Sequence, residues 1–210
     1  MPHLVFDCLD AGPLKFAAAP TLAFRIRIAE TAGDPVHAIA LRCQIRIDPR
    51  RRRYSPDEAS KLTELFGTPD RWGETLKPIQ FAIVPAMVPG FAGSTELELA
   101  VPCSYDLEVA SGKLFSALDD GDIPMVLLFN GTVFSKGTTG FSVQQIPWES
   151  ECEHRLPVRA WRELMDLYFP GEGWLRVGRD VLGRLQRYKA AQAHPTWDGA
   201  LDALLKEAGG

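Results

Sequence analysis

Apolar and polar residues alternate strictly along two segments near the N-terminus, residues 21–30 and 36–47. In the first segment every second residue from Leu22 to Ile28 is apolar, and arginines stand between them. A period of two is typical of a β-strand that buries one face and exposes the other. A Gly-Asp-Pro turn lies between the two segments, within residues 31–35. We therefore predict two half-buried strands that form an antiparallel hairpin.

The middle of the chain continues this alternation and contains its most apolar strand, residues 124–129. Asn130 and Gly131 follow directly, and because Asn-Gly is a strong signal for a type I′ turn, we predict that the chain reverses there. Residues 103–134 are thus expected to be the centre of an antiparallel β-domain. The strands predicted in this part of the chain are residues 79–88, 96–101, 103–109, 124–129 and 141–146.

Helical signals occur in one short segment of the β region and in the C-terminal part of the chain. Ser55, Pro56 and Glu58 provide an N-cap, a proline at the first helical position and the partner of a capping box, which predicts a helix at about residues 56–66. After Pro157 the apolar residues recur at the spacing of an amphipathic helix. Three helices are predicted there, over residues 157–169, 174–192 and 196–205.

These patterns predict a mainly β protein with α-helices. Residues 1–148 are expected to form an antiparallel β-sandwich-like domain with one short helix, at about 56–66. Residues 149–210 are expected to form a three-helix cap docked on it, because these helices have too little apolar surface for a core of their own. An α+β arrangement, with the helices on one face of a single antiparallel sheet, remains the alternative.

Charge is distributed unevenly along the chain. The net charge of −4 and the pI of about 5.6 give no basic field for nucleic acid, so we do not expect a nucleic-acid partner. Residues 95–122 contain seven acids and one lysine, whereas residues 155–189 contain eight bases and four acids. This separation favours contact between the two regions, or an oriented contact with a partner. Glu96 and Glu98 are expected to face the outward arginines of residues 21–30 if the strands are neighbours.

The sequence is expected to belong to a cytoplasmic protein. No segment has the roughly 18 consecutive apolar residues that a membrane-spanning helix requires. Asp7 and Asp10 interrupt the apolar N-terminal residues, and no basic stretch precedes them, unlike in a signal peptide. Cys43 and Cys103 lie on predicted inward faces and are expected to be buried thiols, with a disulfide across the sandwich as the alternative.

Motifs of the common enzyme classes do not occur in the sequence: there is no G-x-S-x-G, no H-E-x-x-H and no G-x-x-x-x-G-K-S/T. No cofactor is therefore predicted. Cys152 and His154 provide two ligands of the kinds that zinc uses, but a structural zinc site requires four, so no metal is predicted either. An enzyme or metal-handling protein with a site around Cys152 and His154, and Cys103 as a further ligand, remains the alternative.

The candidate interface residues are a run of four arginines and an aromatic and basic segment near the C-terminus. Trp and Arg are enriched among the residues that dominate binding energy at protein interfaces. A solvated loop and the packing of large aromatics on a sheet are the structural alternatives for the same residues. The residues assigned to a protein interface are Arg50, Arg51, Arg52, Arg53, Trp174, Arg176 and Arg179.

Four runs of the sequence carry a resemblance to a known family: IPMVLLFNGTVF at 123–134, IPW at 146–148, RLPVRAWRELMDLYFPGEGWLRVGRD at 155–180 and PTWDGALDALL at 195–205. Over about residues 75–208 the chain resembles an uncharacterised family of actinobacterial and other soil-bacterial proteins, often encoded near genes for uptake nickel–iron hydrogenases. The resemblance implies an accessory role and no catalytic residue. We therefore expect a non-enzymatic accessory or assembly protein that binds a partner protein, with a hydrogenase subunit or maturation factor as the candidate.

Overall fold

A computed structural model describes residues 3–103, 105–137, 140–171 and 177–209 of the chain. It consists of two compact units, Met1–Pro170 and Gly171–Gly210, which we call the β-domain and the helical unit. Among the described residues, none of the helices combines the length and the apolar character needed to cross a bilayer.

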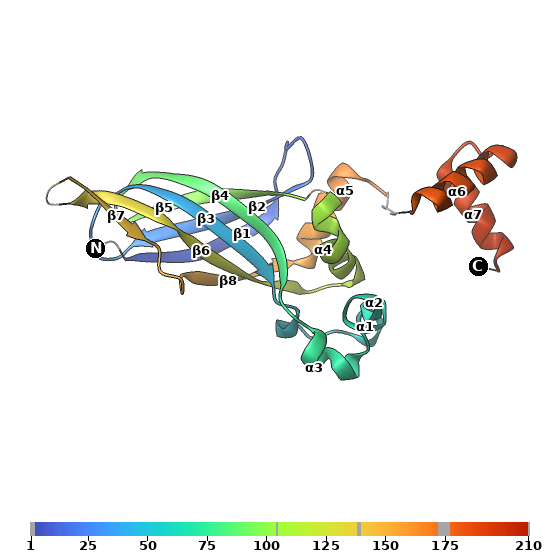
Figure 1. Ribbon diagram of the computed structural model, residues 1–210, viewed down its shortest axis with the longest axis horizontal. Helices are drawn as coiled ribbons and strands as arrows, with labels where there is room; N and C mark the ends of the chain where they lie inside the picture. Colours follow the sequence, from blue (N-terminus) through green and yellow to red (C-terminus); the bar gives the residue numbers. More distant parts are fainter. Residues whose placement is uncertain (1–2, 104, 138–139, 172–176, 210) are drawn as a thin grey trace. The chain divides into compact units, whose positions relative to one another are not determined.

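The β-domain is built from two antiparallel sheets (Figure 1). The first sheet has the strand order β1-β2-β5, and the second has the order β4-β3-β6-β7, with β8 also paired to β6. The prediction of a mainly β protein with antiparallel strands and helices is confirmed, and the alternative of a single sheet is wrong. The strands are β1 (Leu4–Pro13), β2 (Thr21–Glu30), β3 (Val36–Ile47), β4 (Ile79–Phe91), β5 (Ser94–Pro102), β6 (Asp122–Gly137), β7 (Gly140–Gln145) and β8 (Glu151–Pro157).

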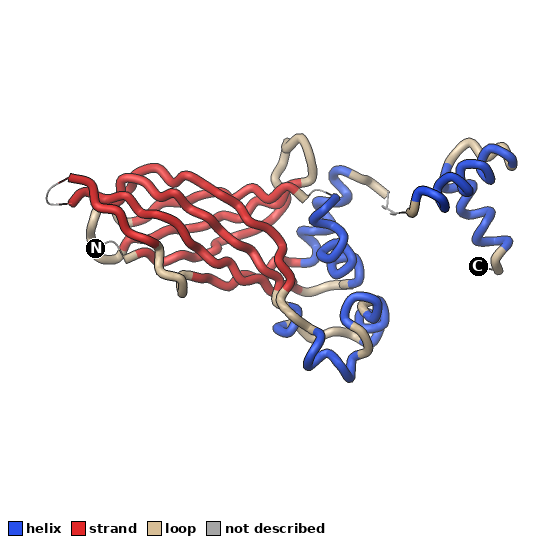
Figure 2. Tube along the Cα trace, viewed as in Figure 1, coloured by secondary structure: helices blue, strands red, loops and turns tan. Residues whose placement is uncertain are grey.

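The helices of the β-domain gather at one end of its strands (Figure 2). The segment predicted as one helix at about residues 56–66 consists of two short ones, and Ser55 and Glu58 form the predicted capping box. The helices of the chain are α1 (Pro56–Lys61), α2 (Thr63–Phe66), α3 (Trp72–Thr75), α4 (Tyr105–Ala117), α5 (Val158–Tyr168), α6 (Arg179–Ala191) and α7 (Trp197–Glu207), with 3-10 turns at Pro49–Arg51 and Pro69–Arg71.

The core lies between the two sheets and follows the predicted alternation. Phe24 and Ile26 of β2 and Ile45 of β3 are completely buried, as are their neighbours two residues away. The register of β2 with β5 places Arg25 opposite Glu98 and the next outward arginine opposite Glu96, as predicted. The acids of β5 are therefore matched within the β-domain, and such pairs help to fix the register of the strands.

The predicted hairpin of residues 21–30 and 36–47 is wrong, because β2 and β3 belong to different sheets. The connection is organised by the buried carboxylate of Glu30, which accepts hydrogen bonds from the backbone N–H groups of Ala32, Gly33 and Asp34, at 2.7–2.9 Å. These bonds turn the chain from one layer of the sandwich to the other. A period of two shows that a strand has one buried face, but it does not show which of two packed sheets the strand belongs to.

The predicted strand at residues 103–109 is also wrong, because α4 begins at Tyr105. Leu114 and Phe115 in the second half of this helix are buried, as is Leu118 just after its end, and Phe115 packs against the ring of Trp161 with centroids 4.8 Å apart. The spacing of these residues is that of one face of a helix. The helix also includes residues 105–109, where the alternation of apolar and polar residues is too short to distinguish a strand from a helix.

The predicted reversal at Asn130 and Gly131 does not occur, because β6 runs without interruption from Asp122 to Gly137. The glycine has a different role: a Cβ atom there would lie 2.1 Å from the carbonyl oxygen of Ala40 on β3, and its φ is +143°. Gly131 thus allows two strands to approach closely. Strand β7 pairs antiparallel with the end of β6, and Gly137 and Gly140 face each other in that register.

Strand β8 lies in the region that was predicted to be entirely helical, residues 149–210. It pairs with β6, so the β-domain continues past the predicted boundary at residue 148 and includes α5. In the helical unit, the hydroxyl of Thr196 caps α7 by accepting a hydrogen bond from the N–H of Gly199 at 3.2 Å. Docking of the C-terminal helices on the β-domain stays a prediction.

Candidate protein-interaction site at an interrupted sheet edge

The edge of the second sheet is shared by two strands. Strand β6 pairs with β7 over its C-terminal half and with β8 over its N-terminal half. Between them the chain leaves the edge after Ile146 and returns at Ser150. The N–H of Ile146 donates to the Gly131 carbonyl at 2.9 Å, and the N–H of Phe129 donates to the Ser150 carbonyl at 2.8 Å. Residues 146–150 therefore form a short loop held to the sheet at both ends.

A pocket of about 300 Å³ lies beside this loop, with the first residues of β1 on its other side. Its interior is apolar: Phe6, Val133 and Ile146 are buried, and the ring of Phe6 stacks on that of Phe129 with centroids 4.2 Å apart. Strand β1 is the last strand of its own sheet, so the pocket lies where edges of both sheets meet. The lining residues are His3, Leu4, Val5, Phe6, Val133, Gln144, Gln145, Ile146, Pro147, Glu149, Ser150 and Glu151.

The loop that borders the pocket exposes a large aromatic side chain. Trp148 stands between the lining residues Pro147 and Glu149, and 88% of its surface is accessible. Val143 on β7, a strand of the same sheet edge, is 61% exposed. Isolated apolar residues at a surface are ordinary, but an exposed Trp next to an apolar cavity is typical of a binding site.

The other side of the pocket is fixed by polar contacts at the start of β1. The backbone N–H of His3 donates to the Glu30 carboxylate at 2.8 Å, and its ring Nδ1 lies 2.8 Å from the hydroxyl of Thr31. These contacts hold β1 against β2, while Glu149 and Glu151 are exposed on the opposite side. The site thus offers an apolar interior, an exposed aromatic side chain in the adjoining loop and two carboxylates, a combination that suits a peptide with an apolar side chain and basic neighbours.

The arginine run, predicted as an interface, is largely engaged inside the β-domain. Arg50 donates to the carbonyls of Leu76 and Gly73, and Arg51 forms ion pairs with Asp48 and Glu153. The side chain of Arg52 is only 10% exposed. Arg53 is exposed. The first three arginines therefore have structural roles, and an interface role for the run stays a prediction.

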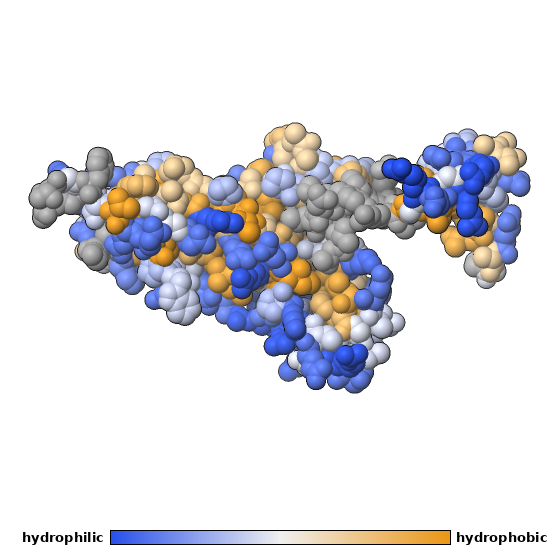
Figure 3. Space-filling view, in the orientation of Figure 1, coloured by the Kyte–Doolittle hydropathy of each residue, from blue (hydrophilic) through white to orange (hydrophobic). Residues whose placement is uncertain are grey.

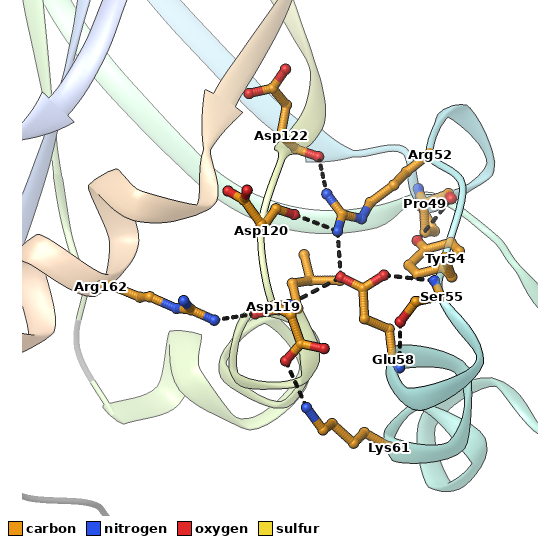
Figure 4. Close-up of polar contacts among 11 residues, drawn as sticks. Pro49, Arg52, Tyr54, Ser55, Glu58, Lys61, Asp119, Asp120, Asp122 and Arg162 are labelled. Atoms are coloured by element: carbon orange, nitrogen blue, oxygen red, sulfur yellow. Dashed lines mark hydrogen bonds and ion pairs between the residues drawn. The ribbon is translucent and has the colours of Figure 1, made fainter.

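Arg52 is the centre of a polar network that joins the helical insertion after β3 to the loop before β6 (Figure 4). It forms an ion pair with Glu58, whose side chain is 5% exposed, and donates to the carbonyls of Asp120 and Asp122. Burial opposes ionisation of Glu58, but the N–H groups of Ser55 and Asp119 and the Arg52 guanidinium outweigh it, so the pKa of Glu58 lies below its ordinary value. This arrangement stabilises the fold.

The candidate metal ligands lie on β8, next to a thiol of β1 that sequence analysis did not connect with them. Strands β1 and β8 lie side by side, and Cys8 and Cys152 are both partly buried. Burial raises the pKa of Cys8 to about 12 and that of Cys152 to about 11, and burial lowers the pKa of His154. Within the described part of the chain no group of three or more His, Cys, Asp or Glu residues has the geometry to hold a metal ion. Cys103 is buried at the end of β5.

Two of the predicted interface residues, Trp174 and Arg176, lie outside the described residues. Arg179 begins α6 and is exposed. None of the four arginines of the run lines the pocket at the interrupted sheet edge, which we call the edge pocket.

The comparison with protein families adds a classification. A family described as "Family of unknown function (DUF6084)" matches the chain over residues 1–210. The chain belongs to this family. No curated protein sequence matches it.

Several solved structures share part of the DUF6084 chain's arrangement at low similarity. A late embryogenesis abundant protein, solved in solution, is 15% identical, with 75% of this chain and 72% of that chain covered and a TM-score of 0.33. The ApaA protein from Bordetella pertussis is 12% identical, with coverage of 74% and 93% and a TM-score of 0.26. β-Glucosidase 3B from Thermotoga neapolitana is 11% identical, with coverage of 73% and only 17% and a TM-score of 0.27. TM-scores this low support no inference about the function of a DUF6084 protein.

The residue that sequence reasoning missed in this DUF6084 chain is Trp148. Its tripeptide Ile-Pro-Trp, residues 146–148, is part of the resemblance found in the sequence, but Trp148 was not among the residues assigned to an interface. The available signal was the proline before it, because a Pro-Trp pair between two strands places the aromatic ring in a loop. The opposite roles of Trp148 and the buried Trp161 are visible only in the structure.

Proposed function

We propose that this protein is a non-enzymatic accessory protein that binds a partner protein at the edge pocket beside Trp148. The observation that carries the proposal is an 88% exposed tryptophan in the loop that borders an apolar pocket at an interrupted sheet edge. Tryptophan in such a position commonly provides a large share of binding free energy once a partner covers it.

The proposed binding mode is the addition of an extended segment along this edge. Strand β7 is the last strand in its sheet order, so its outer side offers backbone groups to a further strand. An apolar side chain of that segment fills the pocket over Phe6 and Ile146. Basic residues on either side of it face Glu149 and Glu151, which favours a basic segment over an acidic one.

The partner proposed from the sequence resemblance is a subunit or maturation factor of a nickel–iron hydrogenase, in the cytoplasm. The resemblance supports a hydrogenase-related partner by gene neighbourhood only. The cytoplasmic location is supported by the occurrence of Cys8, Cys43 and Cys152 as thiols, which suits a reducing compartment.

The test is affinity purification of the full chain from its native host, comparing the unchanged protein with a Trp148→Ala variant. We expect a co-purifying protein that is lost in the variant, because truncation of a central tryptophan costs at least about 2 kcal/mol, or about thirtyfold in Kd. The measured quantity is the Kd of the recovered partner, or of a synthetic segment from it, by titration calorimetry.

Met87→Ala is the matched control, because Met87 is also an exposed apolar residue on an outer strand, β4, and is 66% exposed away from the pocket. It should leave the Kd unchanged. Recovery of the protein only as a free species, or equal binding by the Trp148→Ala and Met87→Ala variants, would contradict the proposed function.

A further inference from the structure

The helical unit exposes apolar residues along one face of each of its two helices, which together we call the stripe. Val181, Leu182 and Leu185 follow the spacing of one face of α6. The same spacing continues in α7 from Trp197 to Leu205, and Figure 3 shows hydrophobic residues at the surface of this unit. The exposed fractions are 47% for Val181, 39% for Leu182, 41% for Trp197 and 61% for Leu205.

The helix pair is too small to bury this stripe by itself. Within its described residues Ala200 is the buried hydrophobic side chain, at 1% exposure. A unit of about 40 residues usually requires a disulfide, a metal or association with another surface to be stable. Residues 171–210 contain no cysteine. Association of the stripe with a further apolar surface is therefore the expected source of its stability.

Charges beside the stripe have opposite signs on the two helices. At 3.6 residues per turn, Arg184 of α6 and Asp198 of α7 each lie about a quarter of a turn from the middle of the stripe on their own helix. Two other charges are used inside the unit: Lys189 donates to the Pro195 carbonyl at 3.1 Å, and Glu207 accepts from the Tyr188 hydroxyl at 3.2 Å.

We propose that a second copy of this chain covers the stripe, so that two helical units form an antiparallel four-helix interface. A two-fold interface brings the same patch of both chains together and requires that patch to be complementary to itself. A stripe with a base beside one helix and an acid beside the other meets this requirement. Helix α6 of one copy lies along α7 of the other, and Arg184 faces the other copy's Asp198 twice. This self-association is independent of the edge pocket.

The experiment measures the mass of the full chain by sedimentation equilibrium over a range of concentrations. The unchanged protein should be a dimer. Leu205→Asp should raise its dissociation constant at least about a hundredfold, because a leucine and its symmetry mate both leave the interface. Leu205 is largely exposed in a single chain, so the variant keeps its fold, which circular dichroism checks.

A charge exchange separates this geometry from nonspecific association. Arg184→Asp and Asp198→Arg should each weaken the dimer, and the variant that carries both changes should regain it. Asp202→Arg is the control, because Asp202 lies further from the stripe and pairs with Lys206 of its own helix at 2.7 Å. Trp148→Ala should leave the dimer intact, so failure of partner binding and failure of dimerisation are distinguishable.

A monomer at every concentration would overturn the proposal and leave the stripe to another surface. A dimer that resists Leu205→Asp, or that the double exchange does not restore, would overturn it equally, because the contact would then lie elsewhere on the chain.

Discussion

The β-domain and the helical unit contain the same kind of hydrophobic pattern with opposite outcomes. In the β-domain the apolar positions of β2 and β3 face each other across the sandwich, and residues such as Phe24 and Ile45 have no exposed surface. In the described residues of the helical unit, only Ala200 is buried among the hydrophobic side chains. A pattern that is satisfied within one chain predicts a core, whereas a pattern left at the surface predicts association with a second molecule.

The tryptophans show the same difference between burial in a core and exposure at the surface. Trp161 is 5% exposed and packs against Phe115, where it contributes to the core of the β-domain. Trp148 and Trp197 are 88% and 41% exposed. An exposed aromatic ring loses the stabilisation that burial would give, so its retention is most simply explained by a partner that covers it.

The largest expected effect concerns the close approach of β6 to β3. Gly131→Ala should destabilise the protein by about 5 kcal/mol or prevent folding, because the new Cβ would lie 2.1 Å from the Ala40 carbonyl oxygen and neither strand can move without breaking the sheet. Urea unfolding followed by circular dichroism measures the change.

Gly140→Ala is the matched control for this substitution. Gly140 has nearly the same φ, +140° against +143°, but an added Cβ there meets nothing within 4 Å. It should therefore show only the cost of the backbone conformation, about 1–2 kcal/mol. Equal effects of the two substitutions would show that close approach to β3 does not matter.

A smaller effect is expected from the buried ion pair at the end of the strands. Glu58→Gln should destabilise the β-domain by about 3 kcal/mol at neutral pH, because Arg52 remains buried without its counter-charge. The loss is at the lower end of the usual range, since Arg52 keeps its bonds to the carbonyls of Asp120 and Asp122.

The pH dependence gives the sign of this contribution. Because the pKa of Glu58 in the folded protein is below its ordinary 4.5, its ionised form stabilises the fold above that pH, and the contribution is lost as the pH falls through the folded-state pKa. The difference in unfolding free energy between the unchanged protein and Glu58→Gln should shrink accordingly between pH 6 and pH 3. Glu64→Gln, which breaks the exposed pair with Lys113, should cost less than about 0.5 kcal/mol. A difference that stays constant with pH would exclude ionised Glu58 as its source.

The sequence predicts the elements of the β-domain better than their partners. Alternation located β2 and β3 correctly, because a half-buried strand alternates apolar and polar residues along its own sequence. It paired them wrongly, because the turn depends on Glu30, whose side chain reads as one more polar residue before a loop. Asn130–Gly131 was likewise misinterpreted, as a turn. A glycine is needed there because β3, more than 80 residues earlier in the chain, approaches too closely for a side chain.

The candidate site was less accessible to sequence reasoning for a physical reason. Its parts come from β1, β6, β7 and the loop after Ile146, which are brought together only by the pairing of two sheets. The residues that were assigned to an interface, such as Arg52, are polar and clustered in sequence, and their cluster is explained by internal bonds. Clustering along the chain therefore identified a structural network, whereas the apolar pocket required the fold.

The smallest expected effect is the loss of one helix N-cap, which can be removed in either unit. Ser55 and Thr196 both accept a hydrogen bond from a backbone N–H at the start of a helix, at 3.1 and 3.2 Å. Removal of either hydroxyl by alanine costs about 1 kcal/mol locally. Ser55→Ala should lower the global unfolding free energy of the β-domain by that amount, because Glu58 of the same capping box is tied into the buried network around Arg52.

Thr196→Ala should instead leave the unfolding midpoint of the β-domain unchanged and raise amide hydrogen exchange only in the helical unit. Hydrogen exchange read by mass spectrometry on both variants distinguishes the two responses. If α7 is held by a second copy, its protection in the unchanged protein should rise with protein concentration, and the alanine variant should follow the same dependence from a lower starting point. Protection that is independent of concentration would instead assign the stability of α7 to contacts within a single chain, and the contrast between a self-sufficient β-domain and a helical unit completed by association would no longer hold.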